Sequence, residues 1–89
     1  MIKKQVKIVN KLGLHARAAA KLVTMASRFE SNIHLARDHQ EVNGKSIMGV
    51  MMLAASQGTE IVISANGPDE NLALSELEQL VANRFEEDE

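Results

Sequence analysis

Length, composition and charge limit this protein to a small globular class. The chain has 89 residues, 45% of them hydrophobic and 25% charged, with a formal net charge of −2 at pH 7. We expect one domain over residues 1–89, because a chain of this length has no room for a second core. Cysteine, tryptophan and tyrosine are absent, which excludes disulfides and thiolate chemistry and disfavours base stacking. No signal sequence or spanning apolar stretch is seen, so a cytoplasmic location without membrane insertion is expected.

Charge is distributed unevenly along the chain. Residues 1–46 carry nine of the ten lysines and arginines and three acids, whereas residues 47–89 carry one arginine and nine acids. Part of the molecule is therefore predicted to present a basic surface, which suits either a nucleic acid or an acidic protein.

The first half of the chain predicts a strand, a helix and two further strands. Residues 5–9 alternate polar and apolar side chains, which is typical of an edge or half-buried strand. From Ala16 onward the chain turns helical, with an apolar stripe at Ala19, Leu22, Val23 and Ala26. Alternation returns over residues 33–36, and a short third strand lies around Val42 after a turn at residues 38–40.

The second half predicts a short helix, a fourth strand and a longer helix. Ser46 is a suitable N-cap for a helix over residues 47–53, and residues 61–65 alternate like a strand. A turn at residues 66–69 leads into the last helix, whose buried stripe is predicted at Leu74, Leu77, Leu80 and Val81. The acidic residues 86–89 are expected to form a frayed, solvated tail.

The resulting order βαββαβα predicts the fold class. Four strands with alternating patterns indicate an antiparallel sheet that has one face in solvent and the helices on the other. We therefore expect an α+β protein, an open-faced two-layer sandwich with a four-stranded sheet and three helices on one face.

His15 is the residue whose position points most directly to chemistry. It follows Gly13, which lets the backbone turn tightly, and it stands at the N-terminal boundary of the predicted helix. Backbone N–H groups at a helix start and the Arg17 guanidinium would together meet an anion bonded to the imidazole. The positive helix end also disfavours a protonated ring and so favours a neutral, nucleophilic one. From these residues alone, a histidine that only caps a helix or faces solvent remains an open alternative.

Several segments give the chain a resemblance to a known family. The Gly-Leu-His-Ala-Arg sequence of residues 13–17 is similar to the active-site signature of the HPr family, the phosphocarriers of the bacterial phosphotransferase system. Residues 43–46, 57–59 and 64–67 resemble further landmarks of that family, and the resemblance covers essentially the whole chain. It implies that His15 receives a phosphoryl group on Nδ1, with Arg17 beside it.

The resemblance also implies enzyme I as the phosphoryl donor and the IIA components of the system as acceptors, in sugar uptake or regulation. The protein would be a carrier with a phosphohistidine intermediate rather than an independent catalyst, would need no metal or other cofactor, and is expected to be a monomer. One position departs from the family, because Ala18 stands where Pro is usual. Ala is a good helix former, so we expect a slightly looser helix start and intact chemistry.

Ser46 has two compatible interpretations. Serine is a preferred N-cap, and in the HPr family a serine at this landmark is the target of a regulatory HPr kinase/phosphorylase in some bacteria. A phosphate there would place about two negative charges beside Lys45 and would oppose docking to an acidic partner.

The short second helix has more apolar residues than it can bury. Val50 and Leu53 are predicted to enter the core, which leaves an exposed apolar patch ringed by basic residues. Since HPr proteins dock through their first two helices, the predicted docking residues are Ala20, Lys21, Thr24, Lys45, Ile47, Met48 and Met51.

Other functions are weaker hypotheses. Within the family, the nitrogen-related regulatory branch stays open, and outside it a small nucleic-acid-binding module is the alternative, although the acidic total and the lack of aromatics argue against it. The Gly44-Lys45-Ser46 sequence resembles the end of a P-loop, but His39 occupies the required earlier glycine position. His34 and His39 lack carboxylate or cysteine companions, so no metal site is expected.

Overall fold

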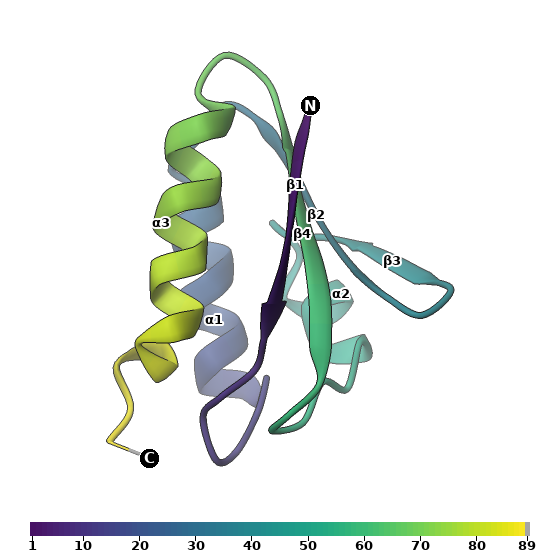
Figure 1. The fold of residues 1–89 in the computed structure, drawn as a ribbon, viewed down its shortest axis with the longest axis vertical. Coiled ribbons are helices and arrows are strands. Elements are labelled where there is room, and N and C mark those ends of the chain that lie inside the picture. The colour runs from purple at the N-terminus through teal and green to yellow at the C-terminus, as the bar shows by residue number, and fades with distance from the viewer. Residues whose placement is uncertain (89) are drawn as a thin grey trace.

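A single four-stranded antiparallel sheet forms one layer of the molecule, in the order β1-β4-β2-β3 (Figure 1). The structure is a computed structural model and describes residues 1–88. Its elements are β1 (Ile2–Lys7), α1 (Ala16–Ala26), β2 (Asn32–Arg37), β3 (Gln40–Asn43), α2 (Ile47–Met52), β4 (Glu60–Asn66), α3 (Glu70–Ala82) and the 3₁₀ turn η1 (Arg84–Glu86). The predicted order βαββαβα and the open-faced α+β sandwich are confirmed.

The core lies between the sheet and the helices. Alternate residues of β2 and β4 are buried, at Ile33, Leu35, Ile61, Ile63 and Ala65. The helices cover them with apolar side chains that include Leu22, Val50, Leu77 and Val81. Figure 1 shows α1 and α3 running side by side, and α1 also contacts α2. The sheet therefore supplies a period-two apolar face and the helices supply apolar stripes, as the sequence predicts.

Two details of the predicted elements are wrong. The first strand begins earlier than residues 5–9, because Ile2 to Lys7 pair with Ala65 to Glu60 of β4. The buried stripe of α1 contains Ala18 in place of Val23, which is only half-buried. The helix is thus turned slightly about its axis relative to the prediction, and it buries Leu22 and three alanines in the core.

The C-terminal segment departs most from the expected solvated tail. Arg84, Phe85 and Glu86 all adopt left-handed backbone angles, with φ between 54° and 65°, so the chain reverses after α3. The reversal places Phe85 in the core, where it is fully buried. Glu86 and Asp88 are exposed as predicted, whereas Glu87 is half-buried against other residues. Glu89 lies outside the described residues.

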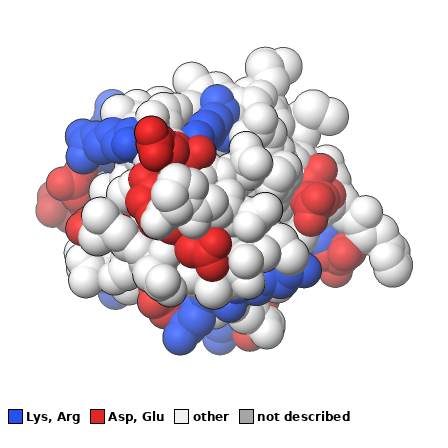
Figure 2. Space-filling model, turned by 90° about the horizontal axis from the view of Figure 1, so that it is seen from above, with Lys and Arg blue, Asp and Glu red and all other residues white. Residues whose placement is uncertain are grey.

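Basic groups of the first half of the sequence form ion pairs with acidic residues of the second half. Lys4 pairs with Glu78 at 3.4 Å, and the N-terminal amine pairs with Glu70 at 3.4 Å, because β1 lies beside α3. Figure 2 shows the end of the molecule opposite the C-terminal tail, where lysine and arginine side chains are interspersed with acids. The predicted basic surface is therefore partly neutralised by the second half. In residues 1–88, no helix is both long and apolar enough to cross a membrane.

Candidate functional site

The loop before α1 is fixed by close backbone contacts around Gly13. Gly13 has φ +67°, and an added Cβ would lie 2.5 Å from the carbonyl oxygen of Ala55 and 2.8 Å from the Cα of Ser56. The next residue, Leu14, donates its backbone N–H to that same carbonyl at 2.8 Å. Only glycine fits this conformation without strain, so the tight turn predicted from the sequence is present and sets where His15 enters the helix.

His15 is the N-cap of α1. Its backbone carbonyl accepts the first helical bond from Ala19 at 2.8 Å, and its Nδ1 accepts from the backbone N–H of Arg17 at 3.3 Å. The side chain is 28% exposed, so the ring is accessible from one side. The predicted helix-start position is confirmed, and it brings Nδ1 to the positive end of α1.

The other ring nitrogen of His15 faces a residue that sequence reasoning missed. Nε2 contacts the Oε2 atom of Glu87, and the Oε1 atom of Glu87 accepts a hydrogen bond from Nδ2 of Asn10 at 2.9 Å. The bond from Asn10, with a smaller effect from His15, holds the pKa of the Glu87 carboxyl below its usual range. The carboxylate is therefore ionised at neutral pH and supports His15 from the side away from the helix start.

His15 opens into a cavity of about 820 Å³ with mixed charge. Its lining consists of Lys11, Leu12, His15, Ala16, Arg17, Lys21, Glu86, Glu87 and Asp88. Among residues 1–88, the Arg17 guanidinium has no hydrogen-bond or ion-pair partner, although its backbone N–H is bonded to His15. This guanidinium is thus free to contact an anion, and its predicted role in stabilising a phosphoryl group stays a prediction.

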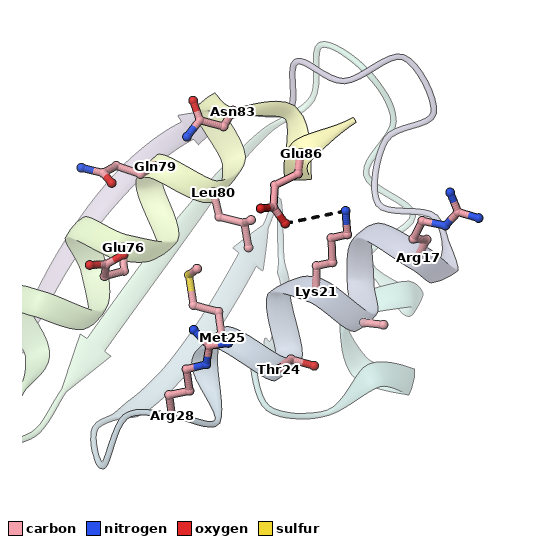
Figure 3. A pocket seen from close by; sticks show the side chains of 11 residues that line it. Arg17, Lys21, Thr24, Met25, Arg28, Glu76, Gln79, Leu80, Asn83 and Glu86 are labelled. Atoms are coloured by element: carbon pink, nitrogen blue, oxygen red, sulfur yellow. Dashed lines mark ion pairs between the residues drawn. The ribbon is translucent and has the colours of Figure 1, made fainter. Parts of the chain in front are cut away.

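A second cavity, of about 470 Å³, lies between α1 and α3 and includes four of the predicted site residues (Figure 3). They are Arg17, Ala20, Lys21 and Thr24. The ammonium of Lys21 reaches across to Glu86 at 3.8 Å and donates to the backbone carbonyl of Phe85 at 2.8 Å. Figure 3 shows the Arg17 guanidinium extending outward from the start of α1. Lys21 is therefore engaged with the C-terminal segment, whereas Arg17 is not.

Comparison with known proteins agrees with this geometry. The family described as "PTS HPr component phosphorylation site" matches residues 2–83. The chain belongs to the HPr family. It is similar to the phosphocarrier protein HPr of Xylella fastidiosa strain Temecula1, with 54% identity over 88 residues that cover 99% of each chain.

Solved HPr structures share the fold at full length. HPr-C-His from Thermoanaerobacter tengcongensis is 45% identical to this chain and has a TM-score of 0.96. The match covers 100% of both chains. An HPr dimer from the same organism is 46% identical with a TM-score of 0.79, over 98% of this chain and 100% of that one. This HPr-family chain is therefore a phosphocarrier of the phosphotransferase system, and the comparisons favour neither the nitrogen-branch nor the nucleic-acid alternative.

The second HPr landmark forms the start of α2. The hydroxyl of Ser46 accepts from the backbone N–H of Gly49 at 3.1 Å, which confirms the predicted N-cap. The neighbouring Lys45 donates to the backbone carbonyl of Phe29 at 2.7 Å. Both side chains are half-buried, so this landmark has a structural role in addition to any regulatory one.

The apolar patch predicted on α2 is present. Val50 and Leu53 are buried, whereas Ile47, Met48 and Met51 are 44%, 71% and 39% exposed. Four large apolar residues that were not predicted as docking residues are also exposed, namely Met1, Leu12, Met52 and Leu72. Because α2 packs on α1, the HPr chain presents Ile47, Met48, Met51 and Met52 on a helix that neighbours the one His15 caps.

His34 and His39 lie outside the site, and within residues 1–88 neither belongs to a group that could hold a metal ion. His34 lies in β2 and is half-buried, and His39 is exposed in the turn before β3. Over the described part of the chain, no three His, Asp or Glu side chains are placed to hold a metal ion.

Proposed function

We propose that this chain carries a phosphoryl group on Nδ1 of His15, in the cytoplasm, accepting it from phospho-enzyme I and passing it to IIA components. The observation that supports this most directly is the position of His15 as the N-cap of α1, with Nδ1 3.3 Å from the backbone nitrogen of Arg17. The membership of the HPr family supports the same class of chemistry. The chain is a single domain over residues 1–89 in this proposal.

The transfer exchanges one nitrogen–phosphorus bond for another. The Nδ1 lone pair of His15 forms the new bond while the bond to the donor's nitrogen breaks, and its electron pair returns to the donor. The backbone N–H of Arg17, which donates to Nδ1 before the transfer, then donates to a phosphoryl oxygen. The guanidinium of Arg17 binds the other phosphoryl oxygens. The positive charge of the guanidinium and of the N–H group stabilises the negative charge on the transferring group, so both groups lower the barrier.

The decisive test is phosphorylation in a purified system. Phosphoenolpyruvate with enzyme I should convert the protein into an acid-labile phosphoprotein, and His15→Ala should abolish the label. The Arg17→Ala variant should keep the fold, because the guanidinium is exposed and unpaired in residues 1–88, and should transfer on the order of 10²-fold more slowly. Full labelling of His15→Ala, or an unchanged rate in Arg17→Ala, would contradict the respective assignment.

Partner docking is proposed on the first two helices. The residues concerned are Ala20, Lys21, Thr24, Lys45, Ile47, Met48 and Met51. The exposed methionines adapt their shape to different partners, and the basic side chains suit acidic ones. The ammonium groups of Lys21 and Lys45 each donate one hydrogen bond within the chain, so they are only partly available to a partner.

Ser46 is proposed as a conditional regulatory site for an HPr kinase/phosphorylase. Its hydroxyl caps α2, and a phosphate in that position still accepts from the backbone N–H groups at the helix start. The helix would therefore persist while the docking surface gained about two negative charges. Regulation of this kind acts through repulsion of an acidic partner rather than through unfolding.

A further inference from the structure

The imidazole of His15 is contacted at both nitrogens, and the two contacts have opposite requirements. Nδ1 lies 3.3 Å from the backbone N–H of Arg17, so it must accept and carry a lone pair. Nε2 lies against a carboxylate oxygen of Glu87, so it must donate and carry a proton. One neutral tautomer satisfies both contacts, the one with hydrogen on Nε2.

Glu87 is itself held by residues far from it in the sequence. Asn10 is fully buried, and its Nδ2 donates to Oε1 of Glu87 at 2.9 Å and to the carbonyl of Gly13 at 2.8 Å. Two residues earlier, Phe85 is buried in the core and its carbonyl accepts from Lys21 at 2.8 Å. The Glu87 side chain is only 16% exposed. The hydrogen bond from Asn10 and the burial of Phe85 therefore fix the Glu87 carboxylate in place beside His15.

We propose that Glu87 is a positioning residue for His15: its carboxylate holds the ring in the Nε2–H tautomer and leaves the lone pair on Nδ1. In the Ser-His-Asp triads of hydrolytic enzymes, a carboxylate orients a histidine in a comparable way. Glu87 lies outside residues 2–83, the part of the chain that the family model matches.

The same carboxylate has a second effect once a phosphoryl group is bound, and this part rests on the proposed function. When Nδ1 gives its lone pair to phosphorus and the donor's bond breaks, the proton stays on Nε2 and the ring becomes positively charged. Glu87 then faces a cationic ring, and the hydrogen bond between them becomes charge-assisted. Formation of the phosphohistidine is favoured as a result.

The tautomer can be measured without phosphoryl transfer, by the ¹⁵N chemical shifts of the His15 ring in the neutral form. We expect the wild-type protein to show the Nε2–H tautomer, and Glu87→Ala to show a mixture with a substantial Nδ1–H fraction. Glu86→Ala is the matched control, because it removes the adjacent carboxylate, which pairs with Lys21 and not with His15; it should keep the wild-type tautomer. A Glu87→Ala spectrum identical to that of the wild type would overturn the proposal.

Phosphoryl transfer from phospho-enzyme I supplies the second readout. The rate for Glu87→Ala should fall roughly tenfold, which corresponds to the loss of one hydrogen bond to a charged group. An altered tautomer with an unchanged rate would overturn the role in transfer. If the wild-type protein accepted no phosphoryl group, the proposed function would fail, and the ¹⁵N spectra would still decide whether Glu87 positions the ring.

Discussion

Asp69 illustrates how one ionised side chain joins two parts of the molecule. It precedes α3, but its carboxylate caps no helical N–H; it accepts from the backbone N–H groups of Glu30 and Ser31 at 2.9 and 3.0 Å and from the Ser31 hydroxyl at 2.5 Å. The Ser31 hydroxyl, followed by the Glu30 N–H, holds the pKa of Asp69 below its ordinary value. The start of α3 is thereby fastened to the segment that leads into β2.

Replacement of Asp69 by asparagine should therefore destabilise the protein in a pH-dependent way. A carboxyl whose pKa is lowered by folding contributes stability above its unfolded pKa, here near 3.8, and loses that contribution as the pH falls through the lower folded pKa. Asp69→Asn should lower the free energy of unfolding at neutral pH and converge with the wild type in acid, because asparagine resembles the protonated acid. Urea unfolding at both pH values measures this; a pH-independent difference would contradict it.

Single residues were predicted well where local rules decide their position. His15 and Ser46 are N-caps as expected, because capping depends on the residue and the helix that follows it. Glu87 was missed, because its contact with His15 depends on a chain reversal at residues 84–86. None of those residues is a glycine, so the sequence carries no local signal for left-handed backbone there. Phe85, one of only two aromatics, was the available indication of a buried segment.

At the scale of elements, α2 depends most on its cap. It has six residues, and Gly49 within it costs about 1 kcal/mol relative to alanine. The Ser46 hydroxyl satisfies the N–H of Gly49, and Val50 anchors the helix in the core. A helix of this length has no stability of its own, so the cap and the anchor hold it.

Removal of the Ser46 hydroxyl should be measurable in stability. Ser46→Ala should lower the free energy of unfolding by about 1 kcal/mol, because the Gly49 N–H loses its acceptor. Ser75→Ala is a suitable control, since Ser75 is exposed within α3 and should show no loss. Urea unfolding of the two variants gives the comparison, and equal stabilities would argue against a capping role.

The positions of the strands and helices along the chain were predicted better than the rotation of the helices about their axes. Periodicity placed all four strands and three helices, because the core selects alternate residues on strands and a stripe on helices. It did not place Ala18 in the core, since the rotation of a helix depends on what packs against it. Ala18 occupies the third helical position, whose N–H has no partner within a helix. Alanine in place of the family's usual proline therefore leaves the hydrogen bonds within α1 unchanged.

At the scale of the whole molecule, the sheet is complete within one chain. β1, β2 and β3 each find their partners among the strands of the same chain, and the core residues are buried without a second copy. We predict a monomer of 9.8 kDa, which sedimentation equilibrium over a range of protein concentrations would measure. A dimer like the HPr dimer of Thermoanaerobacter tengcongensis would give twice that mass and would refute the prediction.

The central place of β4 determines when the protein can fold during synthesis. β1 and β2 both pair with β4 and not with each other, and only β2 and β3 form a pair between consecutive strands. A nascent chain that has reached residue 59 can form the β2–β3 hairpin, but β1 still lacks its neighbour. Pairings over such long sequence separations form slowly and leave apolar surface uncovered meanwhile. Emergence of residues 60–66 from the ribosome is therefore the step that lets the sheet close.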